Sequence, residues 1–195
     1  NSRGLSVNKK LQTTNHRIYA CGDVIGGYNL PNIASYEAKI AVKNALFFSK
    51  NKINYRSIPW GILTQPTLAQ VGLTERQAKN RYDKNDILVL RQYFKTLVSA
   101  QIADETTGIC KIIVSRNGEI LGASLLGAEA KELINIIALA IAEKIKINKL
   151  ANLAPVYSSF SEIIAQTAWE WNKQRFESRR LQDFWDGVFY FLRNR

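Results

Sequence analysis

The feature that most constrains the fold is an Asn-Gly pair placed between two apolar runs. Residues 109–114 and 120–126 are both rich in Ile, Val and Leu, and Asn117-Gly118 lies near the middle of the short segment that separates them. Asn and Gly both tolerate the positive φ that a tight turn between antiparallel strands requires. The sequence therefore predicts a β-hairpin, and with it an antiparallel sheet.

Further strands and helices are predicted around the hairpin. Strands are expected over residues 59–63, 68–73 and 87–94. Thr74 and Gln77 have the spacing of a capping box, in which each side chain bonds a backbone N–H at the helix start, so a helix is expected from there to about Arg81. Later helices are expected over residues 129–145, 147–153 and 158–175. This mixture of elements predicts an α+β fold.

The predicted helix over residues 129–145 is apolar on most of its surface. Its large aliphatic side chains are Leu133, Ile134, Ile136, Ile137, Leu139 and Ile141. A helix of this kind is buried on more than one side. Either the core of its own domain or a partner subunit is expected to cover it.

The first part of the chain has a different pattern. Residues 17–22 read as a buried strand that runs into a loop at Gly22-Asp23. A helix is expected from about Ile33 to Phe48, capped by Asn32 or Ser35.

Three regions follow from these patterns. Residues 51–57 are polar and short, which is typical of a linker, so the expected boundaries are 1–54, 55–175 and 176–195. The last region combines aromatic residues with charges and is expected to be an aromatic-rich helix. It either packs on the domain or its dimer mate, or docks on a partner or a membrane surface.

Composition excludes several classes of protein. Cys21 and Cys110 are too few for a disulfide scaffold or a cysteine-based zinc cluster, and His16 is the only histidine, so no metal site is expected. No apolar run reaches the ~18 residues of a membrane span. The chain begins with Asn1 and shows no signal segment. We therefore expect a soluble cytoplasmic domain or a piece of a longer protein.

The net charge of +11 raises the question of nucleic-acid binding. Residues 1–57 carry most of the excess positive charge. The Lys and Arg residues of this segment are scattered and form no basic block or nucleic-acid-binding motif. No nucleic-acid partner is expected. A solvated surface, or a face that meets an anionic neighbour, accounts for the charge.

Four segments resemble one family. Residues 13–46, TTNHRIYACGDVIGGYNLPNIASYEAKIAVKNAL, resemble the second flavin-binding motif of the pyridine nucleotide–disulfide oxidoreductases. Residues 66–79, 106–141 and 155–168 resemble the C-terminal dimerisation domain of that family, in the same order and spacing. Within the family the chain is most similar to the mercuric reductase and dihydrolipoamide dehydrogenase branch. The resemblance implies an antiparallel-sheet dimerisation domain, preceded by a strand–loop–helix piece of an FAD-binding α/β domain.

The resemblance also implies cofactors and a partner. FAD would be bound in the intact protein, NAD(P)H would be the electron donor at a site outside this chain, and the protein would be a homodimer. Asp23 would bind the flavin's ribityl chain, and Gly22 would let the backbone approach closely. Pro31 and Asn32 would supply backbone contacts at the helix start, where the dipole favours the flavin's electron-rich side.

Tyr157 and Glu162 are the candidate catalytic residues that the resemblance implies. Disulfide reductases of this family carry a histidine at the position of Tyr157, paired with a glutamate at the position of Glu162, and use it across the dimer as acid and base. Tyrosine, with an ordinary pKa of about 10, is a poor general base near neutrality. Mercuric reductases also carry tyrosine there, together with a C-terminal cysteine pair that is not seen before Arg195.

The expected function is therefore the C-terminal dimerisation portion of a flavin-dependent NAD(P)H:disulfide oxidoreductase, or of an enzyme with a related acceptor. The sequence contains neither a GxGxxG loop nor a CxxxxC pair, so this chain is expected to be inactive alone. Two alternatives remain open: a non-catalytic dimerisation or scaffolding module, and a mercuric-type metal reductase.

Overall fold

A computed structural model describes residues 4–47, 50–176 and 193. The chain forms two compact units, Asn1–Trp60 and Gly61–Arg195. Each unit is described by itself. The predicted aromatic helix over residues 176–195 lies outside the described residues, except for the backbone of Phe176 and for Arg193.

The first unit is built on one helix. Its elements are the 3-10 turn η1 (Gly22–Ile25), the helix α1 (Pro31–Leu46) and the 3-10 turn η2 (Tyr55–Ser57). The strand predicted over residues 17–22 is not formed. Only an isolated bridge joins Tyr19 to Gln12 in the described part of this unit. A strand needs a neighbour to accept its ladder of hydrogen bonds, and apolar sequence alone does not supply one.

Helix α1 begins earlier than predicted. Leu30 is its N-cap and Pro31 occupies the first helical turn, so neither Asn32 nor Ser35 caps it. Proline fits this position because its φ is already near the helical value and its missing N–H would have no intrahelical partner there. The helix packs Ile40 and Ala41 against Leu11 in the small core of the unit.

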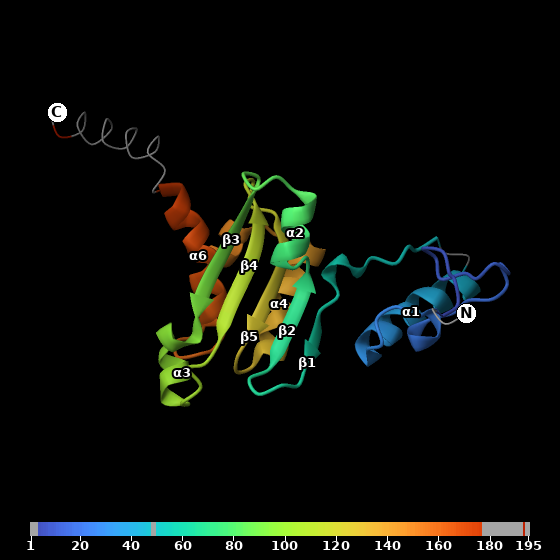
Figure 1. Cartoon of the computed structure of the whole chain (residues 1–195), viewed down its shortest axis with the longest axis horizontal. Helices are drawn as coiled ribbons and strands as arrows, with labels where there is room; N and C mark the ends of the chain where they lie inside the picture. The colour runs from blue at the N-terminus through green and yellow to red at the C-terminus, as the bar shows by residue number, and fades with distance from the viewer. Residues whose placement is uncertain (1–3, 48–49, 177–192, 194–195) are drawn as a thin grey trace. The chain divides into compact units, whose positions relative to one another are not determined.

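The second unit contains a five-stranded sheet (Figure 1). Its strands are β1 (Trp60–Ile62), β2 (Leu68–Gly72), β3 (Ile87–Tyr93), β4 (Ile109–Ser115) and β5 (Ile120–Leu126), in the order β1-β2-β5-β4-β3. The pairs β2–β5, β5–β4 and β4–β3 are antiparallel. The predicted α+β class with an antiparallel sheet is confirmed.

The hairpin predicted at Asn117-Gly118 joins β4 and β5. The Ser115 N–H donates to the Glu119 carbonyl at 2.9 Å, and the Gly118 N–H donates to the Ser115 carbonyl at 2.9 Å. Gly118 has φ +83°, a conformation that strongly favours glycine. The ring of Trp171 lies close to Gly118, so the turn is packed against a helix of the core.

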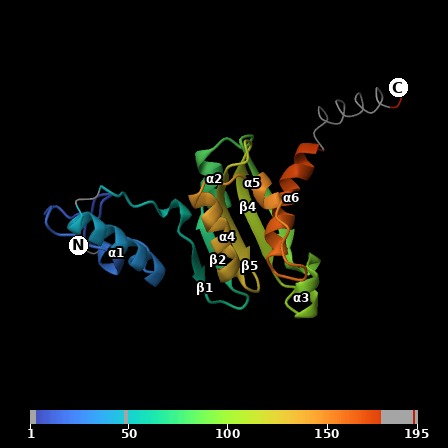
Figure 2. The same cartoon turned by 180° about the vertical axis from the view of Figure 1, so that it is seen from behind.

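Helices cover both faces of the sheet, but unequally. The helices are α2 (Glu75–Arg81), α3 (Val98–Ile102), α4 (Ala130–Ala142), α5 (Ile147–Ala151) and α6 (Glu162–Phe176), with the 3-10 turn η3 (Phe94–Thr96) before α3. Helices α4, α5 and α6 lie on one face and α2 lies on the other (Figures 1 and 2). The main core, between the sheet and α4–α6, contains buried aliphatic residues from all of these elements together with Trp171.

Two helix starts test the capping argument. Thr74 forms the predicted capping box with Gln77: the Gln77 N–H donates to Thr74 Oγ1 at 3.3 Å and the Thr74 N–H donates to Gln77 Oε1 at 3.0 Å. The last helix begins at Glu162 rather than at Ser158. Ser158 has φ +61°, which is incompatible with a right-handed helix and delays its start.

Helix α4 is only partly covered by its own domain. Leu133, Ile134, Ile137 and Ile141 are buried, whereas Ile136 is 38% and Leu139 60% exposed. Ile136 and Leu139 therefore form an exposed apolar patch on a helix whose other large aliphatic side chains are buried. In the described part of the chain, no helix has the length and apolar character to cross a membrane.

Candidate functional site

The first candidate site is the turn at Gly22-Asp23. Gly22 has φ +73°, and a Cβ added there would press against Ala34 of helix α1. The Gly26 N–H donates to the Asp23 carbonyl at 3.0 Å and closes the turn. The side chain of Asp23 remains exposed at this turn. Asp23 is therefore an accessible carboxylate on a backbone whose shape is fixed.

The start of α1 is the second part of this site. Pro31 and Asn32 are both exposed. Asn32 donates from Nδ2 to the Pro59 carbonyl at 2.7 Å, so its side chain is committed to the protein. Pro31 has no N–H to give. Only the backbone groups of this first turn, at the positive end of the helix dipole, remain suited to an electron-rich ligand.

Glu37 is a site residue that the sequence argument missed. Its side chain is 1% exposed. Oε2 accepts from the Gly22 N–H at 2.6 Å, and Oε1 accepts from the Tyr55 hydroxyl at 2.7 Å. Burial raises the pKa of Tyr55 well above its usual value, and the Glu37 carboxylate raises it further. Glu37 thus ties the Gly22 turn to the segment after α1.

A signal for Glu37 was present in the sequence. The buried residues of α1 are Ile33, Glu37, Ile40, Ala41 and Asn44, which follow the spacing of one helix face. A charged residue on an otherwise apolar face must be paired or hydrogen-bonded when it is buried. The helical pattern therefore marks Glu37, although it does not identify the two donors.

The second candidate site is the loop that leads into α6. Tyr157 is 77% exposed. Glu162 accepts from the Ser159 N–H at 3.1 Å through Oε1, and the hydroxyls of Ser159 and Ser161 are 2.7 Å apart. The Glu162 carboxylate thus bonds the segment just before its own helix, and among the described residues it makes no hydrogen bond to Tyr157. Tyr157 therefore lies at the surface of the second unit.

The two free cysteines differ in burial: Cys110 is buried and Cys21 is partly exposed. Burial raises the pKa of the Cys110 thiol to about 12, because the apolar surroundings disfavour a thiolate. Cys110 lies in the main core of the second unit, and Cys21 lies in the first unit. Over the described ranges, no group of three or more His, Cys, Asp or Glu side chains is placed to hold a metal ion.

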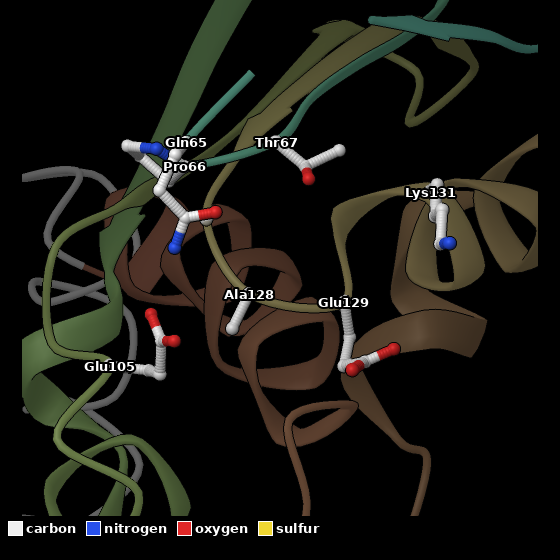
Figure 3. A pocket seen from close by; sticks show the side chains of 8 residues that line it. Gln65, Pro66, Thr67, Glu105, Ala128, Glu129 and Lys131 are labelled. Carbon is white, nitrogen blue, oxygen red and sulfur yellow. The ribbon is translucent and has the colours of Figure 1, made fainter. Parts of the chain in front are cut away.

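A polar pocket of about 250 Å³ lies at one end of the second unit (Figure 3). It is lined by Gln65, Pro66, Thr67, Glu105, Gly127, Ala128, Glu129 and Lys131. Figure 3 shows the Gln65 amide and the Glu105 carboxylate pointing toward one another across it. None of the sequence-predicted site residues belongs to this lining.

Comparison with known proteins places these features in context. Residues 58–168 match the dimerisation domain of the pyridine nucleotide-disulphide oxidoreductases. A mercuric reductase of Staphylococcus aureus is 36% identical over 170 residues, which are 86% of this chain and 30% of that protein. A dihydrolipoyl dehydrogenase of Synechocystis is 33% identical over 168 residues, covering 82% of this chain and 35% of that protein.

Solved structures agree with this match. LpdA of Mycobacterium tuberculosis superposes with a TM-score of 0.79 at 28% identity, covering 86% of this chain and 36% of that one. The HOCl-induced flavoprotein disulfide reductase RclA of Escherichia coli gives a TM-score of 0.75 at 30% identity, covering 87% and 39%. The chain therefore spans about a third of the length of the relatives it matches.

Proposed function

The chain belongs to the pyridine nucleotide-disulphide oxidoreductases and carries their dimerisation domain, and on that premise we propose that it is the C-terminal portion of a flavin-dependent NAD(P)H:disulfide oxidoreductase. The observation that carries the proposal is the match over residues 58–168. The similarity to a relative and to a solved structure extends over more of the chain, 86% of it in each case. A related acceptor in place of a disulfide is part of the same proposal.

The first unit would contribute part of the flavin site. The exposed Asp23 carboxylate can accept hydrogen bonds from the ribityl hydroxyls, and Gly22 provides close backbone approach. The Asn32 N–H is available in the first turn of α1, and Pro31 fixes the direction of that turn. When bound, FAD supplies the hydride chemistry, and these residues hold and orient it.

The second unit would contribute to the partner subunit. Ile136 and Leu139 are exposed on α4, whereas the other large aliphatic side chains of this helix are buried. This exposed apolar pair supports an isologous dimer through the same face of α4. Tyr157 would donate a hydrogen bond in the neighbouring active site, and Glu162 would act through the loop by fixing Ser159. Alone, this chain would be inactive.

The flavin role is tested in the intact enzyme with Asp23→Asn. Loss of the carboxylate removes a charged acceptor, so flavin affinity is expected to fall about tenfold. The matched control is Asp104→Asn, at an exposed turn of the second unit where Asn also tolerates the positive φ. The measurement is flavin bound per protomer after gel filtration. Equal flavin content in the two variants would refute the role of Asp23.

The cross-subunit role is tested with Tyr157→Phe, and Tyr93→Phe serves as the control at another exposed tyrosine. Turnover of NAD(P)H with a disulfide acceptor is expected to fall in the first variant and to stay unchanged in the second. Flavin content should be the same in both. Unaltered turnover in Tyr157→Phe would contradict the assigned role.

A mercuric-type metal reductase is the second candidate. It is favoured by the 36% identity to the Staphylococcus aureus mercuric reductase and by the tyrosine at position 157. The two candidates differ in acceptor. NAD(P)H oxidation by the intact enzyme with Hg²⁺, and not with disulfides, would favour the metal reductase, and the reverse pattern would favour the disulfide reductase.

A further inference from the structure

A polar cleft is lined by residues of helix α2 and of strands β4 and β5. Helix α2 lies on the face of the sheet opposite to α4 and α5 (Figures 1 and 2). The cleft is shallow and largely open to solvent, with a volume of about 520 Å³. The lining consists of Thr74, Glu75, Arg76, Lys79, Asn80, Lys111 and Ser124. The cleft includes none of the residues assigned to the flavin or to the partner active site.

Glu75 organises the charged groups of this cleft. Oε1 accepts from Lys79 Nζ at 2.7 Å, and Oε2 accepts from Lys111 Nζ and Arg91 Nη2, each at 2.9 Å. These three cations come from α2, β4 and β3, so one carboxylate gathers groups from separate elements. The Lys111 side chain is only 27% exposed, which limits its screening by water.

The cluster carries more positive than negative charge. Lys111 and Arg91 share one oxygen, so their charged nitrogens lie at most about 6 Å apart and repel each other. The lining itself contains three cations, Arg76, Lys79 and Lys111, and one acidic residue, Glu75. Arg91 lies outside the lining and joins the cluster through Glu75. The hydrogen bonds to Lys79 and Lys111 hold the pKa of Glu75 at about 2, so its charge stays constant near neutrality.

We propose that this cleft binds a small polyanion with two or three negative charges. Each lysine ammonium has three N–H groups and gives one to Glu75, so further donors can reach a ligand. Phosphate and carboxylate oxygens are the acceptors that match such donors. The Glu75 carboxylate holds the cations in place before the ligand arrives, which reduces the entropic cost of binding.

The dimensions favour a small molecule over a macromolecule. The cationic groups converge on one cleft, and the described residues around it form no extended basic stripe of the kind a nucleic acid needs. Ser124, which also lines the cleft, donates a hydrogen bond to the buried Gln70. This inference is independent of the flavin proposal.

The test is a titration of the 195-residue chain at low ionic strength by isothermal calorimetry. Inorganic pyrophosphate is the phosphate probe, citrate is the carboxylate probe, and chloride is the monovalent reference. The variant is Lys111→Gln, which leaves Glu75 paired with Lys79 and Arg91. The matched control is Lys149→Gln, which removes the same charge from an exposed position on α5.

The expected result is saturable 1:1 binding of one probe, weakened about tenfold in Lys111→Gln and unchanged in Lys149→Gln. The probe that binds more tightly identifies the ligand as phosphorylated or carboxylated. Equal weakening in both variants would mean non-specific attraction to a basic protein and would overturn the proposal, as would the absence of saturable binding. If Lys111→Gln fails to fold, Lys79→Gln, at a half-exposed position of α2, gives the same comparison.

Discussion

The ion cluster at Glu75 predicts a specific dependence of stability on pH. The pKa of Glu75 falls from 4.5 to about 2 in the folded chain, mainly through its hydrogen bonds to Lys79 and Lys111, with a further contribution from Arg91. A folded pKa below the unfolded value means that the ionised carboxylate stabilises the fold above pH 4.5. This contribution is lost as the pH falls from 4.5 through about 2.

The magnitude follows from the shift and from exposure. Taken in full, a shift of this size corresponds to about 3 kcal/mol. The three cations are 27–50% exposed, so solvent screening reduces the contribution to about 1–2 kcal/mol. Glu75→Gln is therefore expected to lower the free energy of unfolding by about 1–2 kcal/mol at pH 7. The difference from wild type should disappear near pH 2.

The assay is urea denaturation followed by far-ultraviolet circular dichroism between pH 7 and pH 2. Glu143→Gln, at an exposed carboxylate that ends α4, is the control and should change little at any pH. A Glu75→Gln deficit that is the same at every pH would refute the electrostatic explanation. So would a deficit of equal size in Glu143→Gln.

Three further predictions concern single positions. Gly122→Ala is expected to destabilise the sheet by about 2 kcal/mol or more in thermal denaturation, because the added Cβ would overlap the backbone of Leu73. Gly27→Ala is the control and should be neutral, because the space around Gly27 is open. In a Cys21→Ser background, the Cys110 thiol should not react with a disulfide reagent at pH 8 until urea unfolds the chain; rapid reaction of the folded chain would contradict its burial. Glu37→Ala removes the acceptor shared by two partly buried donors and should destabilise the first unit by about 1–2 kcal/mol, seen as faster amide hydrogen exchange in α1; unchanged exchange would argue against the tie.

Local patterns predicted the second unit well. The structure confirms the Asn117-Gly118 turn and the Thr74 capping box. Both could be predicted because the residues that form each of them lie close together in the sequence. The antiparallel sheet followed from the hairpin and the spacing of the apolar runs.

Features that depend on distant partners were harder to predict. The strand over residues 17–22 was wrong because sequence does not show whether a neighbouring strand is present to pair with it. Glu37 was missed because its donors come from Gly22 and from Tyr55, on either side of α1. The helix α3 was not predicted, since five residues give little periodic signal. The site roles of Asp23 and Tyr157 came from resemblance and remain proposals.

The central claim is that this chain carries a dimerisation domain that associates through α4. Its most direct test is the mass of the chain by light scattering over a range of concentrations. The account predicts twice 22.1 kDa, persisting on dilution, and a shift to 22.1 kDa in Leu139→Glu but not in Lys144→Glu, which changes an exposed residue just beyond α4. A monomer at every concentration, or a Leu139→Glu variant that still dimerises, would contradict it.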